Sequence, residues 1–179
     1  MAWKNPAIKK AVDRHHDIMA GRKMDEWVSN GLNLVLWAAH KVHGHGKRRT
    51  KATIVRTQRL LSEEFVAGAD KWTDDYTNNI DYASHKLHKA VDGILGKKPR
   101  VAYPMKGWSL DTCIELGIDL GLWALHMEHG LGAERLEKVR SYVVGYQRLH
   151  LTRGKVDSGF EQIKTNVAGI LGELQEVGA

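Results

Sequence analysis

The chain is poor in the residues that build disulfides, zinc sites and kinked or extended backbone. Among its 179 residues there is one cysteine, Cys113, which excludes an internal disulfide framework and a CxxC zinc site. Cys113 lies in an apolar run, so we predict that it is a small core residue. Only three prolines occur, and no apolar–polar alternation indicates a strand. These features predict an all-α protein.

Long apolar runs are also missing. The longest spans residues 34–39, whereas a membrane-spanning helix needs about 20 such residues. The N-terminus lacks the continuous apolar segment of a signal peptide. Hydrophobic residues make up 42% of the chain and charged residues 27%, which is ordinary for a globular protein. We therefore expect a cytoplasmic or virion-enclosed protein that is not secreted and binds no membrane.

An internal repeat is the strongest feature of the sequence. Residues 32–46 and 118–132 share the pattern L-x-L-W-A-x-H-x-x-H-G-x-G at an offset of 86. Two shorter patterns, V-x-x-Q-R-L and V-x-G-I-L-G, then recur in the same order in both halves. Because two copies are too few for an open solenoid, we predict two related units packed about a pseudo-twofold axis.

We predict six to seven helices in a compact bundle. An N-terminal helix within residues 1–23 is expected to end at Gly21, and each unit is expected to supply three helices. The basic first unit spans 24–100 and the slightly acidic second unit spans 101–179. The expected helices cover about 25–43, 47–70 and 73–96 in the first unit, and 109–130, 133–152 and 157 onwards in the second. The first helix of each unit is apolar on all sides, so we expect these two to be the inner pair.

Paired histidines follow the repeated tryptophans. The second unit carries Glu115, Asp119, His126 and His129 along one side of its first helix, a pattern that metal sites in helical bundles use. A metal-dependent enzyme using this stripe is therefore one hypothesis. The first unit has Ser29 and Asn33 in place of the carboxylates, which favours helix capping and buried hydrogen bonds instead. We assign no catalytic residue and no cofactor.

Charge is distributed unevenly between the two units. Residues 1–100 contain 19 Lys and Arg against 11 Asp and Glu, whereas residues 101–179 contain 8 against 10. The charge concentrates at 47–51, where the first unit begins its second helix, and cations there oppose the helix macrodipole. The second unit begins its equivalent helix with Ala133 and Glu134, which suit that position better. A helix start crowded with cations is suited to receiving phosphates.

These observations predict a non-enzymatic, basic helical protein that binds nucleic acid mainly through backbone phosphates, as a virion or nucleoid component would. No zinc finger, basic zipper or helix-turn-helix is recognisable, so base-specific readout is not expected. The alternative is a protein-interaction module, such as a phage-type inhibitor or an assembly adaptor, whose partner is an acidic protein. A homo-oligomer is compatible with either. The candidate nucleic-acid-binding residues are Lys47, Arg48, Arg49, Lys51, Arg56, Arg59, Lys97, Lys98 and Arg100.

Overall fold

The computed structural model describes residues 6–60, 76–97, 110–151 and 156–172. Six helices make up this described part of the chain, and no strand occurs in it. The all-α prediction is therefore confirmed. The helices are α1 (Pro6–His43), α2 (Lys47–Arg59), α3 (Tyr76–Ile94), α4 (Leu110–His129), α5 (Ala133–His150) and α6 (Val156–Leu171).

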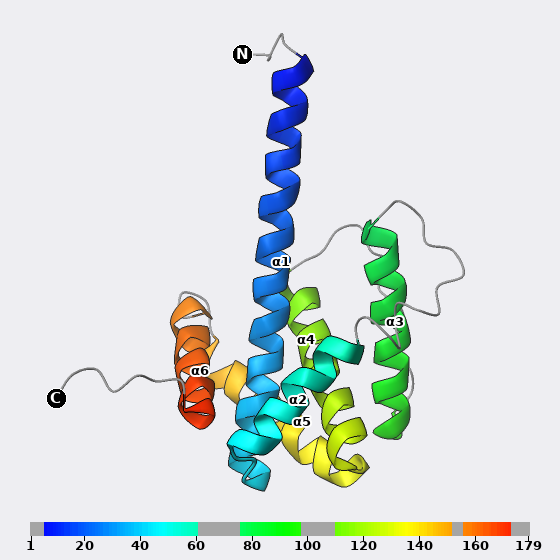
Figure 1. Cartoon of the computed structure of the whole chain (residues 1–179). Helices are drawn as coiled ribbons and strands as arrows, with labels where there is room; N and C mark the ends of the chain where they lie inside the picture. The colour runs from blue at the N-terminus through cyan, green and yellow to red at the C-terminus, as the bar shows by residue number, and fades with distance from the viewer. Residues whose placement is uncertain (1–5, 61–75, 98–109, 152–155, 173–179) are drawn as a thin grey trace, which may run out of the picture.

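Helix α1 corrects the predicted division at the N-terminus. It runs without interruption from Pro6 to His43, so the predicted helix end at Gly21 is wrong. A glycine inside a helix costs only about 1 kcal/mol relative to alanine, and the neighbouring Ala20, Arg22 and Lys23 favour the helical state. In Figure 1 the first half of α1 projects beyond the other helices.

Glycine ends α1 and α4, as the sequence predicted. Gly44 and Gly130 have φ values of 65° and 61° directly after α1 and α4, a conformation that favours glycine. The expected segments 61–70, 73–75 and 98–109 lie outside the described residues. Cys113 is fully buried in α4, as predicted, and burial raises the pKa of its thiol to about 11.

Helices α1 and α4 cross in direct backbone contact. A Cβ atom built on Gly31 would lie 2.1 Å from the carbonyl oxygen of Ile114, and one on Gly117 would lie 1.9 Å from that of Val28. Both distances are far below van der Waals contact, so only glycine allows the helices to approach this closely at either position. The prediction that these two helices contact each other is confirmed.

The remaining helices are interleaved across this central pair. Helices α2 and α3, which follow α1 in the chain, pack on α4. Helices α5 and α6, which follow α4, pack on α1. Figure 1 shows α3 and α6 on opposite sides of the central pair, with α2 crossing it. Each half of the chain therefore covers the central helix of the other half.

The buried faces of α2 and α5 differ in polarity. Helix α5 buries Leu136, Val139 and Val143. Helix α2 buries three threonines at the positions 86 residues earlier, Thr50, Thr53 and Thr57. We call this threonine face, with the part of α4 beneath it, the α2 seam. It holds α2 in place with less apolar surface than α5 contributes, since threonine carries a hydroxyl where valine carries a methyl group.

None of the described helices combines the length and the hydropathy that a bilayer crossing needs.

Candidate nucleic-acid interface

The first turn of α2 gathers four exposed cations. Lys47, Arg48, Arg49 and Lys51 are all exposed, and this turn contains no acidic side chain. Gly46 caps the helix with an extended backbone and supplies no side-chain hydrogen bond. The first helical bond runs from the Thr50 amide to the Gly46 carbonyl, which leaves the amides of residues 47–49 without intrahelical acceptors. The positive charges of the side chains therefore add to the positive end of the helix macrodipole.

Within this turn, Lys47 differs from the other three cations. Its Nζ atom lies beside the C-terminal end of α6, 3.1 Å from the position that a Cβ of Gly172 would take. A cation at a helix C-terminus is electrostatically favourable. Arg48, Arg49 and Lys51 form no ion pair with any other residue that the structure describes. These three are therefore the cations most available to an external anion.

The other predicted cations are placed less uniformly. Arg59 is exposed at the far end of α2, about 16 Å along the helix axis from Arg48. Arg56 is half-buried. Lys97 is paired with Glu137 of α5 at 2.7 Å, which neutralises much of its charge. Lys98 and Arg100 lie outside the described residues.

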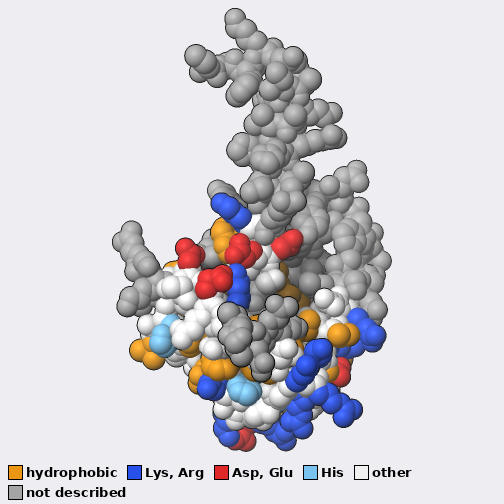
Figure 2. Space-filling model, turned by 60° about the vertical axis from the view of Figure 1, so that its left-hand side comes forward, with side chains coloured by type: hydrophobic (Ala, Val, Ile, Leu, Met, Phe, Trp, Pro, Cys, Tyr) orange, Lys and Arg blue, Asp and Glu red, His pale blue; other side chains and the backbone are white. Residues whose placement is uncertain are grey.

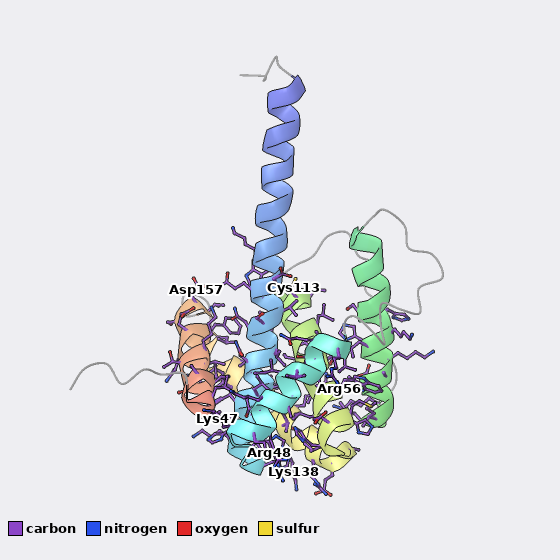
Figure 3. All side chains as sticks on the ribbon, in the orientation of Figure 1. Lys47, Arg48, Arg56, Cys113, Lys138 and Asp157 are labelled. Atoms are coloured by element: carbon purple, nitrogen blue, oxygen red, sulfur yellow. The ribbon has the colours of Figure 1, made fainter. Side chains whose placement is uncertain are left out.

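The beginning of α5 lies at the same end of the molecule as the beginning of α2. His43 Nε2 donates to the carbonyl of Arg135 at 3.0 Å, and His129 Nε2 lies 3.3 Å from the carbonyl of Arg49. Figure 3 labels Arg48 and Lys138 toward this end of the molecule. Arg135 is exposed and extends the basic surface into the second unit. Sequence reasoning missed it, although it matches Arg49 at the repeat offset of 86.

One group of acidic side chains lies where α6 packs on α1, away from the first turn of α2. Glu26 of α1 and Glu161 of α6 share Lys164, at 3.3 Å and 2.8 Å, where α6 packs on α1. Asp157, labelled in Figure 3, lies in the first turn of the same helix. Figure 2 shows many Lys and Arg side chains toward the lower end and a group of acidic ones higher up, with a few acidic side chains among the basic ones below. The charges are thus partly separated along the molecule. The end at which α2 begins is the basic end, although Glu134 lies beside Arg135 at the start of α5.

Three histidine rings lie beneath the basic turn. The rings of His45 and His129 meet edge to face with centroids 4.9 Å apart, and the ring of His43 lies 6.3 Å from that of His45. The Thr53 hydroxyl donates to the Arg49 carbonyl at 2.9 Å, so it accepts from His129 Nε2 at 3.0 Å. The histidine cluster, His43, His45 and His129, therefore joins the ends of α1 and α4 to the start of α2.

His45 is the buried member of this cluster. Only 2% of its surface is exposed, and its Nδ1 atom has no hydrogen-bond partner within the described part of the chain. Burial, together with repulsion from His129, Arg49 and His43, lowers the pKa of His45 to about 4. His45 is therefore neutral at physiological pH.

The predicted metal stripe is engaged elsewhere. Asp119 is buried and pairs with His88 of α3, and His126 Nδ1 donates to the Leu131 carbonyl at 2.9 Å. Glu115 is half-buried on α4. Across the described residues, no three His, Cys, Asp or Glu side chains form a group that could hold a metal ion.

The repeated histidines form hydrogen bonds to backbone carbonyls. His40 Nδ1 donates to the His45 carbonyl at 2.9 Å, and His126 makes the matching bond to Leu131. Each bond ties a helix end to the loop that follows it. We expected His43 and His129 to cap the ends of their own helices. Both instead reach carbonyls in the first turn of a helix from the other half.

No protein-family model, curated protein or solved structure matches this chain.

Proposed function

We propose that this protein binds nucleic acid through the phosphate backbone, using the basic end formed by the first turn of α2 together with Arg135 at the start of α5. The observation that carries the proposal is the set of exposed cations Arg48, Arg49 and Lys51, which pair with no described acid and stand on a helix start that contains none. Cations at this position destabilise the helix by a few tenths of a kcal/mol each, so their presence calls for a compensating use.

The chemistry of the basic end suits phosphate rather than base recognition. Arginine guanidinium groups match phosphate oxygens bidentately, and the free amides at a helix start add further donors. The exposed large apolar residues of the described chain are Val55, Met127, Tyr142, Val144 and Leu149. None of them lies in the first turn of α2, so stacking on bases is not part of the proposal. Binding of this kind is sequence-independent and weakens steeply with salt.

The test is the salt dependence of binding to a DNA duplex and to an RNA duplex. Replacing Lys47, Arg48, Arg49 and Lys51 together with alanine should reduce the slope of log K against log salt by about three to four, since each lost phosphate contact lowers it by about 0.9. The matched control removes four exposed cations elsewhere, Lys23, Lys86, Lys89 and Arg148, and should change the slope by less than about one.

Equal losses in the two quadruple variants would contradict the proposal, because net charge alone would then explain the binding. Salt-insensitive capture of one acidic protein, with no retention on heparin, would favour the protein-interaction alternative. Circular dichroism of both variants should remain helical, so that lost binding is not confused with unfolding.

We further infer that the two halves derive from one duplicated unit arranged about a pseudo-twofold axis. Matched contacts at an offset of 86 support this. Gly31 and Gly117 each meet a carbonyl of the opposite central helix, and His43 and His129 each reach a carbonyl in the opposite half. His40 and His126 each bond to the loop that follows their own helix. Such an axis would pass between the starts of α2 and α5. The basic end would then be a place where the two units contribute jointly, although they differ in charge.

A further inference from the structure

The histidine cluster lies where three chain segments meet. His43 ends α1, His45 stands in the loop before α2, and His129 ends α4. Through Thr53 and the Arg49 carbonyl, His129 also holds the first two turns of α2. The contact between α2 and α4 at this point is therefore made of hydrogen bonds to imidazole rather than of apolar packing.

Protonation of His45 would place a charge in a site where no described group accepts it. The described groups that face its ring are His43 from α1, Arg49 from α2 and His129 from α4, and none of them is an acid. The ring is removed from solvent, so water does not solvate a proton there. The charge can be accommodated only if the ring gains access to water, which requires its covering segments to separate.

The segment best able to separate is α2. Its buried face consists of threonines, and Thr53 and Thr57 satisfy their hydroxyls with carbonyls of α2 itself, at 2.9 Å and 2.7 Å. These bonds persist if α2 leaves α4. Helix α5 has Leu136, Val139 and Val143 at the equivalent positions, and exposing them to water would cost much more.

We propose that the histidine cluster is an acid-sensitive latch, which holds the start of α2 on α4 while His45 is neutral and releases it when His45 gains a proton. The latch is a conformational device that stands apart from the proposed nucleic-acid binding, because it concerns how α2 is held and not what its outer face binds.

The direction of the pH effect follows from the pKa of His45. It is about 4 in the folded chain, against 6.5 for a histidine that water surrounds, as in the unfolded chain. The released state takes up the proton first as pH falls, so the closed latch is fully stable above about pH 6.5 and weakens down to about pH 4.

The experiment is amide hydrogen exchange of the full chain at a series of pH values from about 7.5 to 4.5, corrected for the intrinsic exchange rate. Protection of α2 should fall by up to about tenfold per unit of pH below 6.5, whereas protection of α5 stays level. His45→Leu, which copies Leu131 at the equivalent position of the second half, should make α2 as insensitive to pH as α5.

His45→Gln provides a second variant that cannot titrate but remains polar, in case leucine does not fit the site. It should also abolish the pH response of α2. The proposal is overturned if α2 and α5 lose protection in parallel, or if α2 keeps its pH response when His45 is replaced by either residue.

Discussion

The two halves of the chain bury different chemistry at matching positions. Among the described residues, the first half buries seven polar side chains and the second half buries one, Asp119. The residues at the matching positions of the second half are apolar throughout. At an offset of 86, Asn30, His45, Thr50, Thr53 and Thr57 correspond to Leu116, Leu131, Leu136, Val139 and Val143, and at an offset of 76, Ser84 and Asp92 correspond to Phe160 and Ala168.

Because the halves are interleaved, most buried polar side chains of α2 and α3 lie against the central helix of the second half. Helices α2 and α3 both dock on α4, where the α2 seam and the pair His88–Asp119 lie, and α3 also reaches Arg140 of α5 through Asp92. Helices α5 and α6 dock on α1 through leucine, valine and phenylalanine. Apolar docking is strong and non-directional, whereas polar docking is weaker and depends on geometry and protonation. We therefore expect α2 and α3 to be displaced more easily than α5 and α6.

The largest effect is expected where the halves are alike. Gly31→Ala and Gly117→Ala should each destabilise the fold by about 3 kcal/mol or more, since the added Cβ meets a carbonyl oxygen of the facing helix. Urea denaturation measures both. Gly145→Ala is the control: it is helical with open space around its Cβ and should gain about 0.5–1 kcal/mol. A large loss at only one of the two crossing glycines would break the equivalence of the halves.

Exchanging one residue between the matching faces of α2 and α5 should have effects of opposite sign. Leu136→Thr should cost about 2–3 kcal/mol by removing apolar volume and burying a hydroxyl. Thr50→Val should gain about 1 kcal/mol, because the buried Thr50 hydroxyl has no hydrogen-bond partner among the described residues. Thermal unfolding of the two single variants checks this. A loss in both would mean that the α2 seam depends on the Thr50 hydroxyl.

Acid should weaken the wild-type protein more than the variant that lacks His45. Because the pKa of His45 is lowered to about 4, against 6.5 for a solvated histidine, the free energy of unfolding should fall by about 1–2 kcal/mol between pH 7 and pH 5. His45→Leu should reduce that fall by this amount. Denaturation curves at about pH 7 and pH 5 measure it, and identical pH dependence in both proteins would show that other groups cause the acid sensitivity.

The smallest effect is expected from the exposed bridge between the halves. Lys97→Ala removes the 2.7 Å contact with Glu137, whose two side chains are each 40% exposed or more. Such surface pairs contribute about 0.2–1 kcal/mol, and added salt should remove most of the difference from wild type. If the free energy of unfolding falls by more than about 2 kcal/mol, this contact stabilises the packing of α3 more than an exposed ion pair should.

Local patterns predicted the helices and several of their ends, since Gly44 and Gly130 act through their own backbone conformation. The apolar surface of residues 25–43 and 109–130 likewise predicted the central pair. The interleaving was not predictable, because a pattern reveals which face is buried but not which helix covers it. The α2 seam was missed for a related reason: Thr50, Thr53 and Thr57 look like surface residues in the sequence, and only their neighbours make them buried.

The reciprocal bonds from His43 to Arg135 and from His129 to Arg49 join the two halves of the chain without a covalent link. Each half completes the second helix of the other, so neither half is structurally complete by itself. We therefore expect residues 1–97 and 110–179, produced together as two separate chains, to assemble through these contacts between the described helices. The two fragments should remain associated and co-purify, separating only when the whole molecule unfolds.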